Sequence, residues 1–195
     1  GQLFTNIGWA FLITWLPTYL KTTRGLTVLD TGAYSAVIIL GSWFGFIAAA
    51  YLTDYIGRRN TFLLFAICTS VVALAYTSLP ISNGAMLVLG FPLGFFVSGN
   101  FSGFGSYLAE LFPSRMRGSG QGFVYNAARG LASFSPPLVG YLSDHPPAWF
   151  AKLTWLESSP LAQAIMVVSL SACAIAILTL FFLPETKGKQ LEVFN

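Results

Sequence analysis

A polar stripe runs through one apolar stretch of this sequence. Gln121, Tyr125, Arg129 and Ser133 recur every four residues, and Asn126 lies three positions before Arg129. Side chains at this spacing share one face of an α-helix. The arginine guanidinium stays charged at any workable pH, and its planar fork donates two parallel hydrogen bonds to a carboxylate or phosphate. The stripe therefore predicts a site for an organic anion, held by Arg129 and oriented by its amide and phenol neighbours.

Arg129 also has a structural interpretation, in which it pairs with an acid of another helix. An arginine near the centre of a bilayer costs roughly 2.5 to 3.5 kcal/mol on insertion scales, so it must face a protein interior or a water-filled cavity. Asp54 and Glu110 fall at the ends of apolar stretches and not inside them, which favours a ligand. Asn100, on a separate stretch, is a further candidate for the cavity, although a helix-to-helix hydrogen bond explains it equally well. The predicted binding residues are Arg129, Tyr125, Asn126, Gln121 and Asn100.

Composition sets the class of the protein. Hydrophobic residues make up 55% of the 195-residue chain and charged residues only 9%, whereas a soluble domain averages about 25% charged. A soluble chain would need far more charge to cover its surface, so we expect an integral membrane protein in a lipid bilayer. The net charge of +3 comes from residues between apolar stretches and indicates topology, not a nucleic-acid partner. Cys68 and Cys173 are isolated within apolar stretches, so we expect no metal site and no cofactor.

Six apolar segments approach the roughly 20 residues that a membrane-spanning helix needs. They cover residues 3–20, 33–53, 61–79, 84–109, 118–142 and 161–183, and a tail follows at 184–195. Their sequences lack the strict polar and apolar alternation of membrane β-strands. The sequence therefore predicts an all-α polytopic membrane protein, with residues 1–195 forming one transmembrane unit.

Basic residues are distributed unequally between the two sides of these segments. One side holds Arg58, Arg59, Arg115, Arg117, Lys187 and Lys189. The other side holds only Lys21, Arg24 and Lys152. Because loops rich in Lys and Arg stay in the cytoplasm, we predict that the first side and both chain ends are cytoplasmic, in a cell or inner membrane.

A short sequence echo indicates internal symmetry. Ala50–Asp54 (AYLTD) closes the second segment, and Gly140–Asp144 (GYLSD) closes the fifth. Copies that are separated by three spans lie on opposite membrane faces. The echo therefore predicts an inverted pair of three-helix repeats, a construction known from secondary transporters.

Glycine and proline mark where the predicted helices pack or bend. Glycines four positions apart let helix backbones approach closely in lipid, and we interpret four such pairs as packing sites. These pairs are Gly41/Gly45, Gly90/Gly94, Gly99/Gly103 and Gly118/Gly122. The stretch Gly99–Gly105 is denser in small residues than packing requires, which equally favours a flexible or cavity-lining segment. Pro136 and Pro137 follow Arg129 and predict an interrupted backbone ladder and a kink.

Three loop motifs carry a family resemblance. Asp54–Arg59 (DYIGRR) resembles the short cytoplasmic loop D-R-x-G-R-R of the major facilitator superfamily. Glu110–Gly118 (ELFPSRMRG) is similar to the ELFPxxxRG loop between that family's tenth and eleventh helices, and Pro184–Gly188 (PETKG) to the motif that closes its twelfth. All three occur in order and at the end of the matching segment, so the resemblance covers essentially the whole chain. It implies helices seven to twelve of a twelve-helix transporter, an inverted 3+3 repeat.

The resemblance also implies a function and partners. A secondary transporter is expected and an enzyme is not, with an N-terminal six-helix half as the partner of this chain. The pattern Tyr125-Asn126-x-x-Arg129 resembles branches that carry carboxylates with protons, such as sialate, lactate and aromatic-acid symporters. A small anionic solute and coupled protons are therefore implied, and a sugar or other neutral-solute porter of the same superfamily stays the alternative. His145, in a proline-rich outer loop, is expected to face solvent and not to couple protons.

Charged residues at the ends of the segments are predicted to control the conformational change. Asp54 can meet Arg58 or Arg59, and Glu110 and Glu185 lie beside further basic residues. Partly buried ion pairs at helix ends favour one arrangement of the helices, and a rocking transporter must break and remake them. The alternative is that these charges only fix the topology. The predicted gating residues are Asp54, Arg58, Arg59, Glu110, Arg117 and Glu185.

Overall fold

A computed structural model of the chain describes residues 7, 14–22, 25, 27–78, 82–152 and 159–182. Within these ranges all regular structure is helical and no strand occurs, which confirms the predicted all-α fold class. The α-helices are α2 (Leu16–Thr22), α3 (Val28–Ile56), α4 (Arg58–Ser78), α5 (Asn83–Ser102), α6 (Phe104–Leu111), α7 (Arg117–Ala132), α8 (Ser135–Asp144) and α9 (Pro160–Phe182). A short 3₁₀ helix, η2 (Ala148–Lys152), connects α8 to α9.

Four stretches of the described chain are long and apolar enough to cross a membrane. They are Gly32–Ile56, Arg58–Tyr76, Asn83–Leu111 and Pro160–Phe182. They overlap the predicted segments 33–53, 61–79, 84–109 and 161–183. The segment 118–142 is divided between α7 and α8. Most of segment 3–20 and the tail 184–195 lie outside the described residues.

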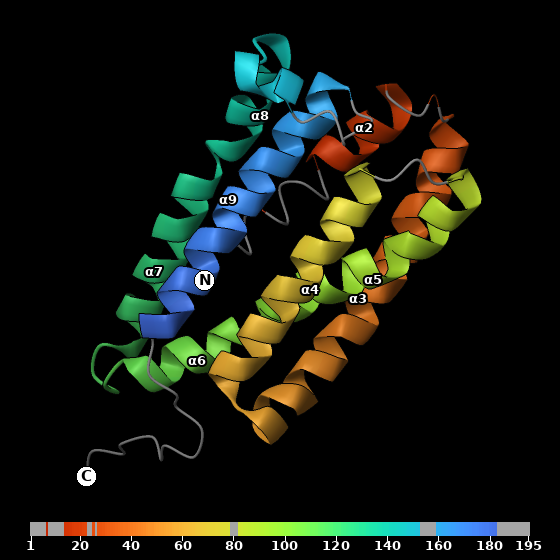
Figure 1. Cartoon of the computed structure of the whole chain (residues 1–195). Helices are drawn as coiled ribbons and strands as arrows, with labels where there is room; N and C mark the ends of the chain where they lie inside the picture. The colour runs from red at the N-terminus through yellow and green to blue at the C-terminus, as the bar shows by residue number, and fades with distance from the viewer. Residues whose placement is uncertain are drawn as a thin grey trace.

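The two ends of the bundle separate the loops that the sequence places on opposite membrane faces. Figure 1 shows the α3–α4 turn, α6 and the end of α9 on one side of the molecule, and α2, the end of α8 and η2 on the other. The echo Ala50–Asp54 is therefore at one end of the bundle and its copy Gly140–Asp144 at the opposite end. This is the placement that an inverted repeat requires.

Glycine lets α3 and α5 pack with their backbones in contact. A Cβ atom at Gly41, Gly45 or Gly94 would overlap a backbone carbonyl oxygen of the facing helix. Within the same interface Ser98 donates a 2.8 Å hydrogen bond to Ser42 Oγ. Both serines are buried, so this bond satisfies two hydroxyls that lipid could not solvate. The packing interpretation is confirmed for these glycines.

The glycine pair on α7 behaves differently. An added Cβ at Gly118 or Gly122 would meet no atom of the described chain within 4 Å. Packing at this pair is therefore not found within the described chain, where the face of α7 that carries it borders a cavity.

The fourth apolar stretch is divided at Gly103, between α5 and α6. The break falls inside the glycine-dense stretch Gly99–Gly105, where the sequence left flexibility, cavity lining and packing open. An added Cβ at Gly103 would come within 3.0 Å of the Phe62 ring. Glycine here therefore lets α4 approach the chain where the helix axis changes.

The fifth stretch is interrupted just before its two prolines. α7 ends at Ala132, and Pro136 and Pro137 lie in the first turn of α8, where a missing N–H costs no helical hydrogen bond. The predicted interruption occurs, but the prolines begin a helix and do not bend one. The Ala132 carbonyl, which would otherwise bond the nitrogen of residue 136, accepts a 2.7 Å hydrogen bond from Ser135 Oγ.

Candidate functional site

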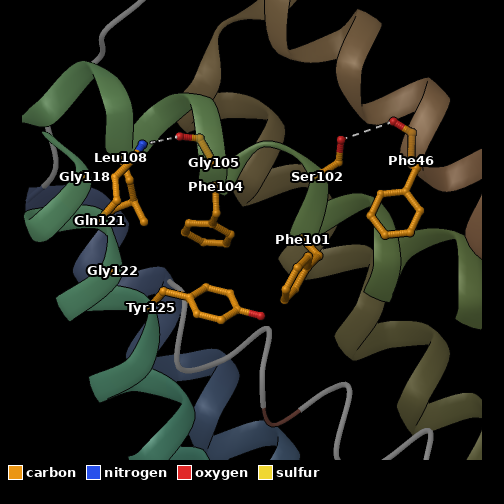
Figure 2. Close-up of a pocket in the computed structure, with 10 residues that line it drawn as sticks. All are labelled: Phe46, Phe101, Ser102, Phe104, Gly105, Leu108, Gly118, Gln121, Gly122 and Tyr125. Carbon is orange, nitrogen blue, oxygen red and sulfur yellow. Dashed lines mark hydrogen bonds between the residues drawn. The ribbon is translucent and has the colours of Figure 1, made fainter.

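A cavity of about 700 Å³ lies where α3, the α5–α6 break and α7 meet. Its volume is in the range of sites that hold small molecules. Its lining combines four aromatic rings with two further polar side chains, three glycines and a leucine, as Figure 2 shows. The lining residues are Phe46, Phe101, Ser102, Phe104, Gly105, Leu108, Gly118, Gln121, Gly122 and Tyr125.

Aromatic rings from two helices face each other in the cavity. The rings of Phe101 and Tyr125 meet edge to face, with centroids 6.2 Å apart and planes at 83°. Behind them the ring of Phe104 stacks on Phe62 of α4 at 4.5 Å, and both are buried. Figure 2 shows Phe101, Phe104 and Tyr125 converging on the same space. The buried stack on Phe62 therefore holds the Phe104 ring in place before any ligand enters. We call the lining rings of Phe46, Phe101, Phe104 and Tyr125 the aromatic wall.

Two polar side chains of the cavity bridge neighbouring helices. Gln121 Nε2 donates a 2.9 Å hydrogen bond to the Gly105 carbonyl and so ties α7 to α6. Ser102 Oγ donates a 3.3 Å bond to the Phe46 carbonyl and ties α5 to α3. Both bonds are drawn in Figure 2. The cavity walls are thus held by hydrogen bonds as well as by ring packing.

The structure divides the predicted polar stripe of α7. Gln121 and Tyr125 line the cavity, whereas Asn126 and Ser133 are exposed and bond carbonyls of their own helix, at Gly122 and Gly130. Arg129 is exposed. Its side chain lies one helical turn beyond Tyr125, about 6 Å between Cβ atoms.

Arg129 has no hydrogen-bond or ion-pair partner within the described part of the chain. An acid that would satisfy it is therefore not found among those helices. Asn100 is buried in α5, and its Oδ1 has no hydrogen-bond partner among the described residues. It is not one of the residues that line the cavity. The sequence placed these two polar groups in one site, but neither lines the cavity: Arg129 is exposed one turn beyond Tyr125, and Asn100 is inside the bundle.

The aromatic wall was missed by the sequence reasoning. Phe46, Phe101 and Phe104 have no polar atom that would single them out, and phenylalanine is common in this chain. The sequence feature that points to them is the glycine-dense stretch Gly99–Gly105, which contains Phe101 and Phe104 and favours a flexible or cavity-lining segment. Only packing distinguishes these rings from those that face lipid.

An ion-pair cluster joins the start of α4 to the end of α6. Arg58 Nη2 lies 2.9 Å from Glu110 Oε1, and Arg58 Nε donates to the same oxygen at 3.2 Å. Arg58 Nη1 lies 3.2 Å from Asp54 on α3. The side chains of Arg58 and Glu110 are only 16% and 11% exposed, whereas that of Asp54 is 79% exposed. The shorter and more deeply buried ion pair of the cluster is therefore Arg58–Glu110, which joins α4 to α6.

The other predicted gating residues make different contacts. The Arg59 guanidinium lies over the Phe181 ring of α9, 5.7 Å from its centroid, a cation–π distance. Arg117 Nε donates a 2.9 Å hydrogen bond to the Ala109 carbonyl and so caps the last turn of α6. Glu185 and the motif that contains it lie outside the described residues.

Replacing Gly120 by alanine is expected to destabilise the α6–α7 connection. An added Cβ would lie 2.6 to 2.8 Å from ring atoms of Phe112, and overpacking of this kind costs about 1 to 3 kcal/mol. Thermal unfolding in detergent would measure it as a lower Tm. Gly118→Ala on the same helix is the matched control, because no described atom lies within 4 Å of its added Cβ. Equal Tm values for the two variants would contradict the packing described here.

Comparison with known proteins places this arrangement in a family. A family model described as Major Facilitator Superfamily matches residues 1–193. The chain is 33% identical over 181 residues to a protein described as "Probable 4-methylmuconolactone transporter" from Cupriavidus pinatubonensis, covering 93% of this chain and 39% of that protein. It is 31% identical over 141 residues to a D-galactonate transporter from Escherichia coli, covering 69% of this chain and 33% of that protein.

The fold also has a solved counterpart. The inward-open xylose transporter XylE from E. coli superposes with a TM-score of 0.74 at 16% sequence identity, covering 95% of this chain and 46% of that one. At this identity the likeness shows the fold. The chain spans less than half the length of each of these proteins.

Proposed function

This chain belongs to the Major Facilitator Superfamily, whose members are transporters and not enzymes, and we propose that it contributes to uptake or export of a small organic anion. In this proposal the solute crosses the membrane by alternating access, with a binding site near the bilayer midplane. The observation that carries the proposal is Arg129. It is a charged side chain in an apolar stretch, it has no partner among the described residues, and it lies one turn from a cavity.

The anion is held by the arginine fork and oriented by its neighbours. Arg129 donates to a carboxylate, Tyr125 and Gln121 contact it from the cavity wall, and Asn126 and Asn100 join when the helices move. The similarity to a D-galactonate transporter supports only the carboxylate group of this cargo, since galactonate is a carboxylate. Protons are the proposed coupling ion, on the resemblance of the Tyr125–Arg129 pattern to proton symporters.

The proposed assembly contains a second six-helix half. The chain covers 39% of one relative and 46% of the XylE chain, which supports a partner half that closes the cavity from the opposite side. The proposed location is a cell or inner membrane, with both ends of this chain cytoplasmic. The cytoplasmic face would then carry the Arg58 cluster.

That cluster is the proposed gate. Arg58 and Glu110 join α4 to α6, and α6 carries the cavity residues Gly105 and Leu108. Breaking the Arg58–Glu110 ion pair would let α6, with its cavity residues Gly105 and Leu108, move relative to α4. Asp54, Arg59, Arg117 and, outside the described residues, Glu185 would stabilise the same closed arrangement.

A screen of solutes on the full-length transporter tests the proposal. Small carboxylates at saturating concentration are expected to raise its Tm, because a ligand present at 100 times its Kd stabilises a protein by about 2.7 kcal/mol. Neutral sugars at the same concentration are expected to leave Tm unchanged. Stabilisation by sugars alone would refute the anion proposal and favour the neutral-solute porter.

A further inference from the structure

We propose that the cavity between α3, α5, α6 and α7 is a subsite for a flat apolar end of the anion. The cargo would then be a ring or conjugated carboxylic acid, and a polyhydroxylated acid would bind poorly. This inference rests on the proposed function, because Arg129 supplies the other end of the same site. The rings that would set the preference are those of Phe101, Tyr125 and Phe46.

The ring geometry fits a flat guest. Phe101 and Tyr125 meet edge to face and both line the cavity, so a flat ring in the cavity can pack against them. Phe104 cannot turn away, since it is buried and stacked on Phe62 at 4.5 Å. Phe46 completes the lining from α3. A flat apolar group would meet fixed aromatic surfaces with little loss of side-chain freedom.

The polar groups of the cavity are unsuited to a chain of hydroxyls. One of the two N–H groups of the Gln121 amide is donated to the Gly105 carbonyl, and the Ser102 hydroxyl proton is donated to the Phe46 carbonyl. A sugar acid in this cavity would lose the hydrogen bonds of its hydroxyls to water, and it would meet aromatic rings and donors that already have partners. Polar groups that lose water without gaining a partner oppose binding.

The polar groups with unused hydrogen-bonding capacity are few. Within the described chain they are Gln121 Oε1, the second N–H of the Gln121 amide, the Ser102 oxygen as an acceptor and the Tyr125 hydroxyl. Tyr125 is one turn before Arg129, so the polar end of the site adjoins the guanidinium and its apolar end is the aromatic wall. This polarity matches an amphipathic acid with its carboxylate at one end.

Binding of two probes of equal charge to the purified full-length transporter tests the inference. Benzoate is a flat ring acid, and D-gluconate is a polyhydroxylated acid. Equilibrium binding of each labelled anion is expected to give a Kd at least about 10-fold lower for benzoate, a difference of about 1.4 kcal/mol. Similar Kd values, or tighter binding of gluconate, would overturn the aromatic subsite.

Variants locate the preference on the rings. Phe101→Leu keeps an apolar side chain and is expected to raise the benzoate Kd about fivefold with little effect on gluconate. Phe46→Leu is the second variant, expected to act in the same direction if Phe101→Leu is poorly folded. The matched control is Phe91→Leu, on the same helix but outside the lining. If neither Phe101→Leu nor Phe46→Leu changed the ratio of the two Kd values, the rings would not be the selective element.

Failure of the inference can be distinguished from failure of the proposed function. If Arg129→Ala weakens both anions while wild type does not prefer benzoate, the anion site stands and the aromatic subsite falls. If neither anion binds and a neutral sugar does, the proposed function falls and the subsite falls with it. If wild type prefers benzoate, Arg129→Ala weakens both anions equally and a ring variant weakens benzoate alone, both stand.

Discussion

Replacing Arg129 by alanine is expected to lower uptake of the proposed anion by about 30-fold or more in the full-length protein. Truncating one partner of a desolvated, hydrogen-bonded charge pair costs about 2 to 5 kcal/mol, and each 1.4 kcal/mol is tenfold in binding. The fold should survive, because Arg129 is exposed and has no partner among the described residues. Uptake into proteoliposomes and Tm in detergent measure the two effects separately.

Two further variants give this prediction its specificity. Arg129→Lys keeps the positive charge but loses the bidentate fork, so its uptake should lie between wild type and Arg129→Ala. Arg115→Ala removes an exposed arginine from the loop before α7 and should leave uptake near wild type. Normal uptake by Arg129→Ala would show that the guanidinium does not hold the cargo. A large loss of Tm would assign it a structural role instead.

The class of fold could be predicted from the sequence, because lipid leaves few alternatives for a long apolar segment. A chain with 9% charged residues and repeated apolar stretches must satisfy its backbone internally, and helices do so within one segment. The exact course of the helices could not be predicted. The breaks at Gly103 and at Ser133–Phe134 depend on what packs beside them, such as the Phe62 ring and the Ser135 hydroxyl.

The candidate site was predictable only in its polar half. Gln121, Tyr125 and Arg129 are recognisable because polar groups in an apolar helix are expensive and repeat at helical spacing. Phe46 and Phe101 are apolar and would be equally stable facing lipid. Their position in a cavity can therefore be recognised only from the packing of α3 and α5. The stripe also contained side chains that satisfy themselves locally, since Asn126 bonds the Gly122 carbonyl one turn earlier.

The charged cluster shows the same limit. The loop motif Asp54–Arg59 predicted that Asp54 could meet Arg58 or Arg59, and the structure contains the contact with Arg58 at 3.2 Å. The stronger partner, Glu110, is 52 positions away in sequence. Its pairing with Arg58 follows from the approach of α6 to the start of α4, a tertiary contact that no local spacing encodes.

Glu110→Gln is expected to destabilise the contact between α4 and α6 far more than Asp54→Asn, although both remove a carboxylate from the same guanidinium. Glu110 is 11% exposed and Arg58 16%, so loss of the acid leaves a largely buried cation that keeps its contact with the exposed Asp54, and the cost approaches that of breaking a buried pair, about 3 to 5 kcal/mol. Asp54 is 79% exposed, and exposed ion pairs contribute about 0 to 1 kcal/mol. The two variants are therefore matched in chemistry and differ in burial.

Two measurements separate stability from gating. The Tm of Glu110→Gln should fall by several degrees, while that of Asp54→Asn stays near wild type. A cysteine introduced at Gly105, on the cavity wall of α6, should react faster with a membrane-permeant thiol reagent in Glu110→Gln, in a background lacking Cys68 and Cys173. The swapped pair Arg58→Glu with Glu110→Arg should restore part of both values, because the pair is a contact between opposite charges. Equal behaviour of Glu110→Gln and Asp54→Asn would mean that α4 and α6 are held by packing alone, and the cluster would then fix topology without controlling the cavity.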